Sequence, residues 1–126
     1  MTKLEAWISK FLFSEDNSEK GLRNPQKVYD LLRIQPKGKI ILISGTNGKG
    51  TIGEILTQFG LQKGLKVGTF SSPHLIRINE RIKINGEPIK DDLFLNSLES
   101  VKRVKGDIPL NFFQYLALAM MKIFND

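Results

Sequence analysis

The chain has 126 residues, 40% of them hydrophobic, and a formal net charge of +6. This length and apolar content suffice for the core of one domain. No apolar run approaches the roughly 20 residues of a membrane-spanning helix, and the absence of cysteine excludes disulfides and cysteine-bound metals. Lys and Arg are spread along the chain, so we expect a solvated basic surface without a nucleic-acid or membrane partner. The N-terminus lacks the apolar stretch of a signal peptide, which predicts a cytoplasmic protein.

The N-terminal region predicts two helices joined by a polar loop. Apolar residues at spacings of three and four indicate an amphipathic helix over residues 3–13. The loop spans residues 14–21, and Asn24 followed by Pro25 is typical of a helix start, with Asn24 as the cap. This second helix is expected to end before Pro36. The first helix takes its apolar face from Leu4, Trp7, Ile8, Phe11 and Leu12.

A glycine-rich segment then separates a predicted buried strand, residues 39–44, from a predicted helix, residues 51–63, that ends at Gly64. This order is typical of a phosphate-binding loop, because glycines let the backbone approach a phosphate while helix N–H groups and Lys49 attract it. Thr51 would place a hydroxyl near a phosphate-bound Mg²⁺. The segment reads Gly45, Thr46, Asn47, Gly48, Lys49, Gly50 and Thr51.

The spacing of this loop differs from the usual one. Only two residues separate Gly45 from Gly48, and Gly50 stands between the lysine and the hydroxyl residue. An ordinary glycine-rich turn between a strand and a helix is therefore the alternative interpretation.

The second half of the chain predicts a further strand, a hairpin and two helices. Residues 66–70 follow the loop helix, so strand, helix and strand would form a parallel crossover unit. The fold class is therefore expected to be α/β with a parallel sheet of the P-loop type. Alternation over residues 81–84 and the turn at Asn85–Gly86 indicate a hairpin. Helices are predicted over residues 91–104 and 112–124.

This inventory is small for a parallel sheet, which normally has several strands covered on both faces. The last predicted helix is also apolar nearly all round, so we expect it to need more protein for its burial. The chain is therefore interpreted as the front part of a larger α/β domain, with residues 1–37 as a helical lead-in and 38–126 as the phosphate-loop portion. Four residues of the last helix are expected to be exposed in the chain alone, namely Phe112, Leu116, Met120 and Phe124.

Several motifs together resemble one family. The glycine-rich loop is followed by Ser71-Ser72-Pro73-His74-Leu75, then by Asn79-Glu80-Arg81-Ile82, Ile84-Asn85-Gly86 and a segment over 106–114. This order resembles the N-terminal part of the folylpolyglutamate synthase/dihydrofolate synthase family, ATP-dependent amide ligases related to the Mur ligases. The resemblance covers about residues 38–124. Mur relatives usually have Thr directly after the lysine, so Gly50 favours the folate branch.

The resemblance implies an enzyme that adds L-glutamate to dihydropteroate, to a reduced folate or to both. ATP and Mg²⁺ are the implied cofactors, the architecture is that of the Mur ligase central domain, and the protein is expected to be a monomer. The substrate carboxylate would become an acyl phosphate before the amide forms. The rest of the ATP-binding domain and the C-terminal domain would lie outside this chain, so the 126 residues alone are expected to be inactive.

Site residues can be carried over where the motifs match. Thr46, Asn47, Gly48 and Lys49 would contact the ATP phosphates, with Lys49 the catalytic residue, while Gly45, Gly50 and Thr51 shape the loop. Ser72 corresponds to a metal ligand, with Thr51 beside it. The pterin pocket would be lined by Asn111, Phe112, Phe113 and Gln114, although many relatives carry Thr and Glu in place of Asn111 and Gln114.

Alternatives stay open for these assignments. Ser72 could be a turn serine before Pro73, and Phe112 and Phe113 could be core residues. His74 is expected to be a loop residue with nothing nearby to orient it, and Glu80 and Arg81 to anchor the loop through polar contacts. Two other functions also stay open, which are a nucleotide-binding remnant without ligase activity and a Mur-type cell-wall ligase.

Overall fold

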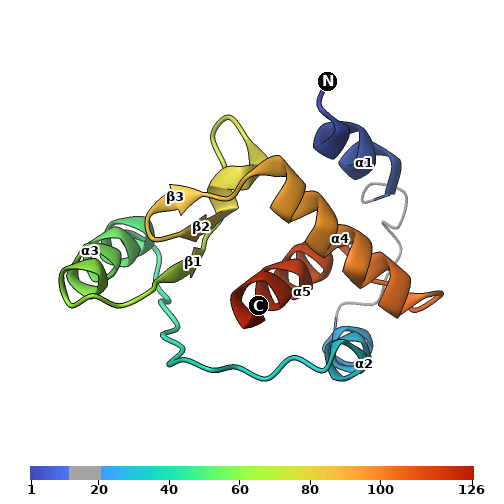
Figure 1. Cartoon of the computed structure of the whole chain (residues 1–126), viewed down its shortest axis with the longest axis horizontal. Coiled ribbons are helices and arrows are strands. Elements are labelled where there is room, and N and C mark those ends of the chain that lie inside the picture. The colour runs from blue at the N-terminus through green and yellow to red at the C-terminus, as the bar shows by residue number, and fades with distance from the viewer. Residues whose placement is uncertain (12–20) are drawn as a thin grey trace. The chain divides into compact units, whose positions relative to one another are not determined.

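The computed structural model describes residues 1–11 and 21–126 and divides into two compact units. The helical unit comprises Met1–Lys37 and Asp91–Asp126, and the sheet unit comprises Gly38–Lys90. Figure 1 gives the order of the elements along the chain. The predicted helix end at residues 12–13 and most of the predicted loop after it lie outside the described residues.

In the described part of the helical unit there are four helices, and their apolar faces form its core. Helix α5 packs against α4 and α2, and α1 packs against α4 (Figure 1). Tyr115 of α5 is buried, meets the Trp7 ring edge-on at 5.8 Å between ring centroids, and donates its hydroxyl to the Leu98 carbonyl at 3.4 Å. The two predicted C-terminal helices are thus confirmed. The bounds are α1 Lys3–Phe11, α2 Arg23–Leu32, α4 Asp91–Lys105 and α5 Phe112–Asn125.

The burial of α5 corrects one expectation. Leu116 was expected to be exposed but is fully buried, and Phe112 and Met120 are half-buried; only Phe124, at 37%, counts as exposed. The reason is that α2 and α4 both pack against α5 within this chain. An all-round apolar helix therefore finds most of its partners here, because it lies between neighbours rather than on a surface.

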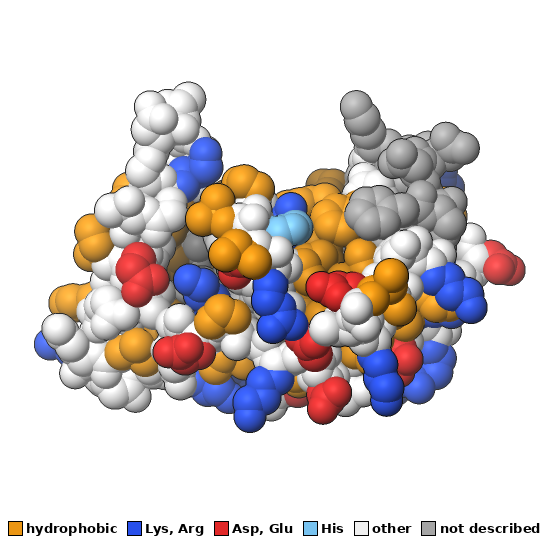
Figure 2. All heavy atoms as spheres, turned by 90° about the horizontal axis from the view of Figure 1, so that it is seen from above, with side chains coloured by type: hydrophobic (Ala, Val, Ile, Leu, Met, Phe, Trp, Pro, Cys, Tyr) orange, Lys and Arg blue, Asp and Glu red, His pale blue; other side chains and the backbone are white. Residues whose placement is uncertain are grey.

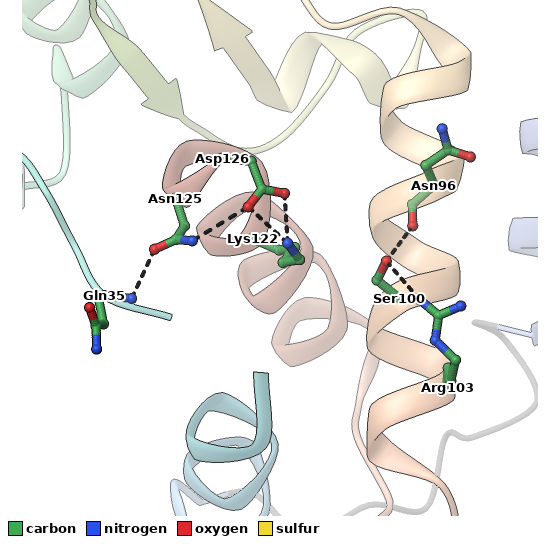
Figure 3. Close-up of polar contacts among 7 residues, drawn as sticks. All are labelled: Gln35, Asn96, Ser100, Arg103, Lys122, Asn125 and Asp126. Carbon is green, nitrogen blue, oxygen red and sulfur yellow. Dashed lines mark hydrogen bonds and ion pairs between the residues drawn. The ribbon is translucent and has the colours of Figure 1, made fainter. Parts of the chain in front are cut away.

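Polar contacts differ between the start of α2 and the end of α5. Asn24 is not the cap of α2, since the helix begins at Arg23 and no side chain caps it. At the other end of the unit, the Asn125 side chain accepts a hydrogen bond from the Gln35 backbone N–H at 2.8 Å (Figure 3). Lys122 and Asp126 form an ion pair at 2.6 Å, and this bond lowers the pKa of Asp126. These contacts tie the segment after α2 to the end of α5.

The sheet unit contains one α-helix, one short 3₁₀ helix and a small antiparallel sheet. The strand order is β1-β2-β3, with Phe70 paired to Ile82 and Ile84 to Glu87. The predicted turn at Asn85–Gly86 is confirmed, with φ values of 52° and 83°. Gly64, with φ of 73°, follows the helix end as predicted. The bounds are α3 Lys49–Gln62, β1 Gly68–Phe70, the 3₁₀ helix η2 Ile78–Arg81, β2 Ile82–Ile84 and β3 Glu87–Pro88.

The predicted parallel sheet is wrong for the described chain, although the broader α/β class holds. Residues 39–44 carry no strand, and Figure 1 draws the segment between α2 and α3 as a coil without an arrow. β1 pairs antiparallel with β2 instead. A strand needs a neighbour for its backbone hydrogen bonds, and none of the described residues provides one for residues 39–44. Three side chains of this segment are accordingly exposed, namely Ile40 (80%), Ile41 (68%) and Leu42 (90%).

Candidate functional site

The glycine-rich segment forms an open start to helix α3. Gly45 has φ of 151° and Gly48 has φ of 79°, both in the region that L side chains rarely adopt. Gly48 is the N-cap of α3, and no side chain caps this end. The first turn of a helix leaves backbone N–H groups without an intrahelical partner, and the first turn of α3 holds no acidic residue. These N–H groups and the positive end of the helix dipole therefore suit an anion.

Lys49 lies at the first position of α3 and folds over the loop. Its ammonium donates a hydrogen bond to the Gly45 carbonyl, four residues earlier in the chain. The side chain that is predicted to bind phosphate thus links Lys49 to the first residue of the glycine-rich segment. The positive charge consequently sits beside the open N-terminus of the helix, which concentrates attraction for an anion at one place.

Gly50 differs from the other two glycines of the loop. Its φ is not in the left-handed region, and a Cβ built on it would meet no atom within 4 Å. The free chain therefore does not require glycine at position 50 for reasons of its own fold. Close approach of a ligand would supply a reason, because a Cβ would stand where a phosphate meets the first turn.

Ser72 lies in the loop that leaves strand β1. The Ser71 backbone N–H donates to the Arg81 carbonyl at 2.9 Å, which closes the base of the loop. Ser72 itself is exposed. The expected approach of Ser72 to Thr51 was based on parallel pairing between residues 39–44 and β1, and this pairing is absent from the described residues. The metal-ligand role of the two hydroxyls stays a prediction.

Glu80 and Arg81 anchor this loop through polar contacts, as expected. The Glu80 carboxylate accepts hydrogen bonds from the backbone N–H groups of Arg77, Leu75 and Ile76, at 2.6, 3.0 and 3.0 Å. The bonds from Arg77 and Leu75 are the main causes that hold the pKa of Glu80 below its ordinary value. A carboxylate placed three to five residues after the N–H groups that it accepts is a local signal, readable from the sequence.

The expectation that nothing would orient His74 is wrong. The Arg81 Nε–H donates to His74 Nδ1 at 2.8 Å, in a half-buried setting. Nδ1 is therefore an acceptor, and the ring proton of neutral His74 resides on Nε2. Seven residues separate the pair, so only the folded loop brings them together.

The predicted pterin-pocket residues begin helix α5 in the helical unit. The Gln114 backbone N–H donates to Asn111 Oδ1 at 2.9 Å, and the Asn111 backbone N–H donates to Gln114 Oε1 at 3.0 Å. This reciprocal pair is a capping box. The Gln114 amide also donates to the Gly21 carbonyl at 2.8 Å. Phe112 is half-buried, whereas Phe113 is 52% exposed. Both amide side chains therefore stabilise the start of α5, a structural role that was not among the sequence predictions.

Metal sites, membrane-spanning helices and charged patches are the other features to consider in the rest of the described chain. Among the described residues, no three His, Asp or Glu side chains gather as a metal site. No helix in the described part of the chain is long and apolar enough to cross a membrane. On the face drawn in Figure 2, basic side chains alternate with acidic and hydrophobic ones. The start of α3 and the loop after β1 are therefore the candidate site in the sheet unit.

Comparisons with known proteins agree on one family. No family model matches the chain. The dihydrofolate synthase/folylpolyglutamate synthase of Escherichia coli strain K12 is 34% identical over 91 residues, which are 72% of this chain and 22% of that protein. The chain thus spans about a fifth of the length of this curated relative.

Two solved structures share the fold of the chain. Escherichia coli FolC in complex with DHPP and ADP has a TM-score of 0.91 and 31% identity, covering 98% of this chain and 30% of that one. A bifunctional folylpolyglutamate synthase/dihydrofolate synthase with Mn, AMPPNP and L-glutamate bound has a TM-score of 0.92 and 35% identity, covering 100% of this chain and 31% of that one. The sequence comparison and the structural comparison therefore indicate the same family, the dihydrofolate synthase/folylpolyglutamate synthases.

Proposed function

Because the chain is related by sequence and by fold to the dihydrofolate synthase/folylpolyglutamate synthase family, we propose that it supplies the ATP-phosphate site of a ligase that adds L-glutamate to dihydropteroate or a reduced folate. The single observation that carries the proposal is the start of α3, where Gly48 in the left-handed conformation and Lys49 create an open anion site. The solved relatives with ADP, AMPPNP and L-glutamate support the choice of ligands.

The work of this chain in such a ligase is positioning and charge neutralisation. The substrate carboxylate attacks the γ-phosphate of ATP and becomes an acyl phosphate with release of ADP. The amino group of glutamate then displaces phosphate and the amide forms. Lys49 exchanges the neutral Gly45 carbonyl for an ionised phosphate oxygen, so that both partners of the new hydrogen bond carry charge. Backbone N–H groups at the start of α3 hold the same phosphates.

We propose that the hydroxyl groups of the sheet unit contribute to a magnesium ion that arrives with the nucleotide. Thr51 and Ser72 offer neutral hydroxyl oxygens, and no cluster of three acidic or histidine side chains is present among the described residues. Mg²⁺ in nucleotide sites keeps several waters and takes oxygens from the phosphates. We therefore assign Thr51 and Ser72 as supplementary ligands. When bound, the ion neutralises charge on the transferred phosphate.

For the pterin or folate substrate, we assign the contact to the aromatic residues at the start of α5. The exposed part of Phe113 offers a flat apolar face to a heterocycle, which is worth about 1 kcal/mol beyond burial of its area. The side-chain oxygens of Asn111 and Gln114 serve the capping box. Their part in substrate binding is therefore to fix the turn that presents Phe112 and Phe113.

Titration of the chain with Mg·ATP tests the proposal. Lys49→Ala is expected to weaken binding at least tenfold, which corresponds to about 1.4 kcal/mol. The matched control is Lys66→Ala, because Lys66 is an exposed lysine of the same unit, outside the loop, and this variant is expected to bind like the wild type. Equal affinities of all three proteins would overturn the assignment of Lys49. Binding without glutamate ligation by any longer form of the protein would favour a nucleotide-binding remnant.

A further inference from the structure

The loop over residues 71–81 is braced by hydrogen bonds at three levels. Its base is closed by the bond from Ser71 N–H to the Arg81 carbonyl. Its middle is crossed by the bond from Arg81 Nε–H to His74 Nδ1. At its tip, the Glu80 carboxylate accepts hydrogen bonds from three successive backbone N–H groups, those of residues 75–77. A loop with these hydrogen bonds presents a restrained backbone.

Ser72 lies inside this bracing. The residue before it and the residue two positions after it both bond to Arg81, one to its backbone and one to its guanidinium. Glu80 directly precedes Arg81, and its carboxylate restrains residues 75–77 immediately beyond His74. The C-terminal part of the loop is also anchored, because the buried Asn79 side chain donates to the Ile89 carbonyl at 2.8 Å. Little freedom is left to the backbone that carries Ser72.

The Glu80 bonds are strong for an exposed loop. A carboxylate that accepts from backbone N–H groups forms charge-assisted bonds, which are shorter than bonds between neutral groups. The 2.6 Å contact with Arg77 N–H is of this kind. Glutamine at this position would keep the length of the side chain but offer a single neutral oxygen, so it could not gather three donors equally well.

We propose that Glu80 is a positioning residue of the ligase, which holds the loop over residues 71–81 so that the Ser72 hydroxyl meets the magnesium–nucleotide complex without a rearrangement. The inference rests on the function proposed above and on the assignment of Ser72 to the metal. A preorganised ligand costs less ordering on binding than a mobile one. Glu80 itself touches neither nucleotide nor metal and acts through the backbone of the loop.

A comparison of nucleotide binding with and without Mg²⁺ tests this role. Glu80→Gln is expected to weaken binding of Mg·ATP by about fivefold and to leave binding of ATP in a chelator unchanged, because only the metal-dependent part of the affinity uses Ser72. His74→Ala removes the hydrogen bond with Arg81 that crosses the middle of the loop. It should likewise weaken binding of Mg·ATP and leave binding of metal-free ATP unchanged. Glu87→Gln, which changes an exposed glutamate of strand β3, is the matched control.

A double-mutant cycle separates positioning from general stabilisation. If Glu80 acts through Ser72, the double variant Ser72→Ala with Glu80→Gln binds Mg·ATP no more weakly than Ser72→Ala alone. Additive losses, or equal losses with and without Mg²⁺, would overturn the inference. A wild-type chain that binds no nucleotide would instead overturn the proposed function, and the inference with it. Wild-type binding that Glu80→Gln leaves unchanged would remove only the inference. Amide exchange of α3 confirms that each variant is folded.

Discussion

Two glycines of helix α3 provide a test of how tightly the sheet unit is packed. A Cβ built on Gly60 would lie 2.7 Å from Val67 Cγ2, whereas ordinary contact begins at 3.4 Å. A Cβ on Gly53 would meet only Ile43 Cδ1, at 3.8 Å. The same Gly→Ala change is therefore expected to have opposite effects at two positions in one helix.

The magnitude follows from two opposing contributions. Alanine in a helix interior is favoured over glycine by about 0.8–1.0 kcal/mol, and this gain applies to both positions. Overpacking costs about 1–3 kcal/mol, and it applies to Gly60 alone. Val67 cannot easily retreat, because its side chain is stiff and its backbone bonds to Asn85 twice, at 2.9 and 2.7 Å. We expect Gly53→Ala to stabilise α3 by up to about 1 kcal/mol. The opening free energy of α3 in the Gly60→Ala variant is expected to be about 1–3 kcal/mol lower than in the Gly53→Ala variant.

Hydrogen exchange of the α3 amides measures this difference directly, since local opening free energy sets the exchange rate. A gap of 1–3 kcal/mol corresponds to a ratio of about 5–150 between the two variants. The fluorescence of Trp7, the single tryptophan, reports the helical unit and checks that it stays folded. Equal protection of α3 in both variants would show that the contact between Gly60 and Val67 does not limit packing.

Three further predictions concern the candidate site. Gly50→Ala should leave the stability of the chain unchanged or raise it by up to about 1 kcal/mol, and it should weaken Mg·ATP binding in a titration. An unchanged affinity would show that no phosphate approaches this position. The backbone amides of residues 75–77 should stay protected from exchange above the ordinary carboxyl pKa of 4.5 and should lose this protection as the pH falls through the lowered pKa of Glu80. The reason is that a carboxylate with a depressed pKa in the folded state stabilises that state only while it is ionised. Protection that survives complete protonation of Glu80 would contradict this. The purified 126-residue chain should transfer no labelled glutamate to dihydropteroate or tetrahydrofolate, and turnover comparable to that of a longer relative would refute our view of where the catalytic unit ends.

Several features were predictable from the sequence because they depend on neighbouring residues. The Asn85–Gly86 turn, the Gly64 helix end and both C-terminal helices follow from local backbone preference and apolar spacing, and the structure contains each of them. The glycine-rich start of α3 belongs to the same group, since glycine permits the positive φ that Gly48 adopts there. Helix starts were less well predicted, because Asn24 is a good cap that the chain does not use.

Other features depended on residues far apart in the chain, and only the tertiary structure decided them. Strand β1 pairs with β2 rather than with residues 39–44, because pairing is chosen by the available neighbour and not by the strand sequence. Leu116 is buried because α2 and α4 come together around α5. Gln114 bonds to Gly21, 93 residues away. The sequence by itself therefore determined the phosphate-loop motif and the local elements, whereas long-range contacts decided which faces are buried and which polar groups are occupied.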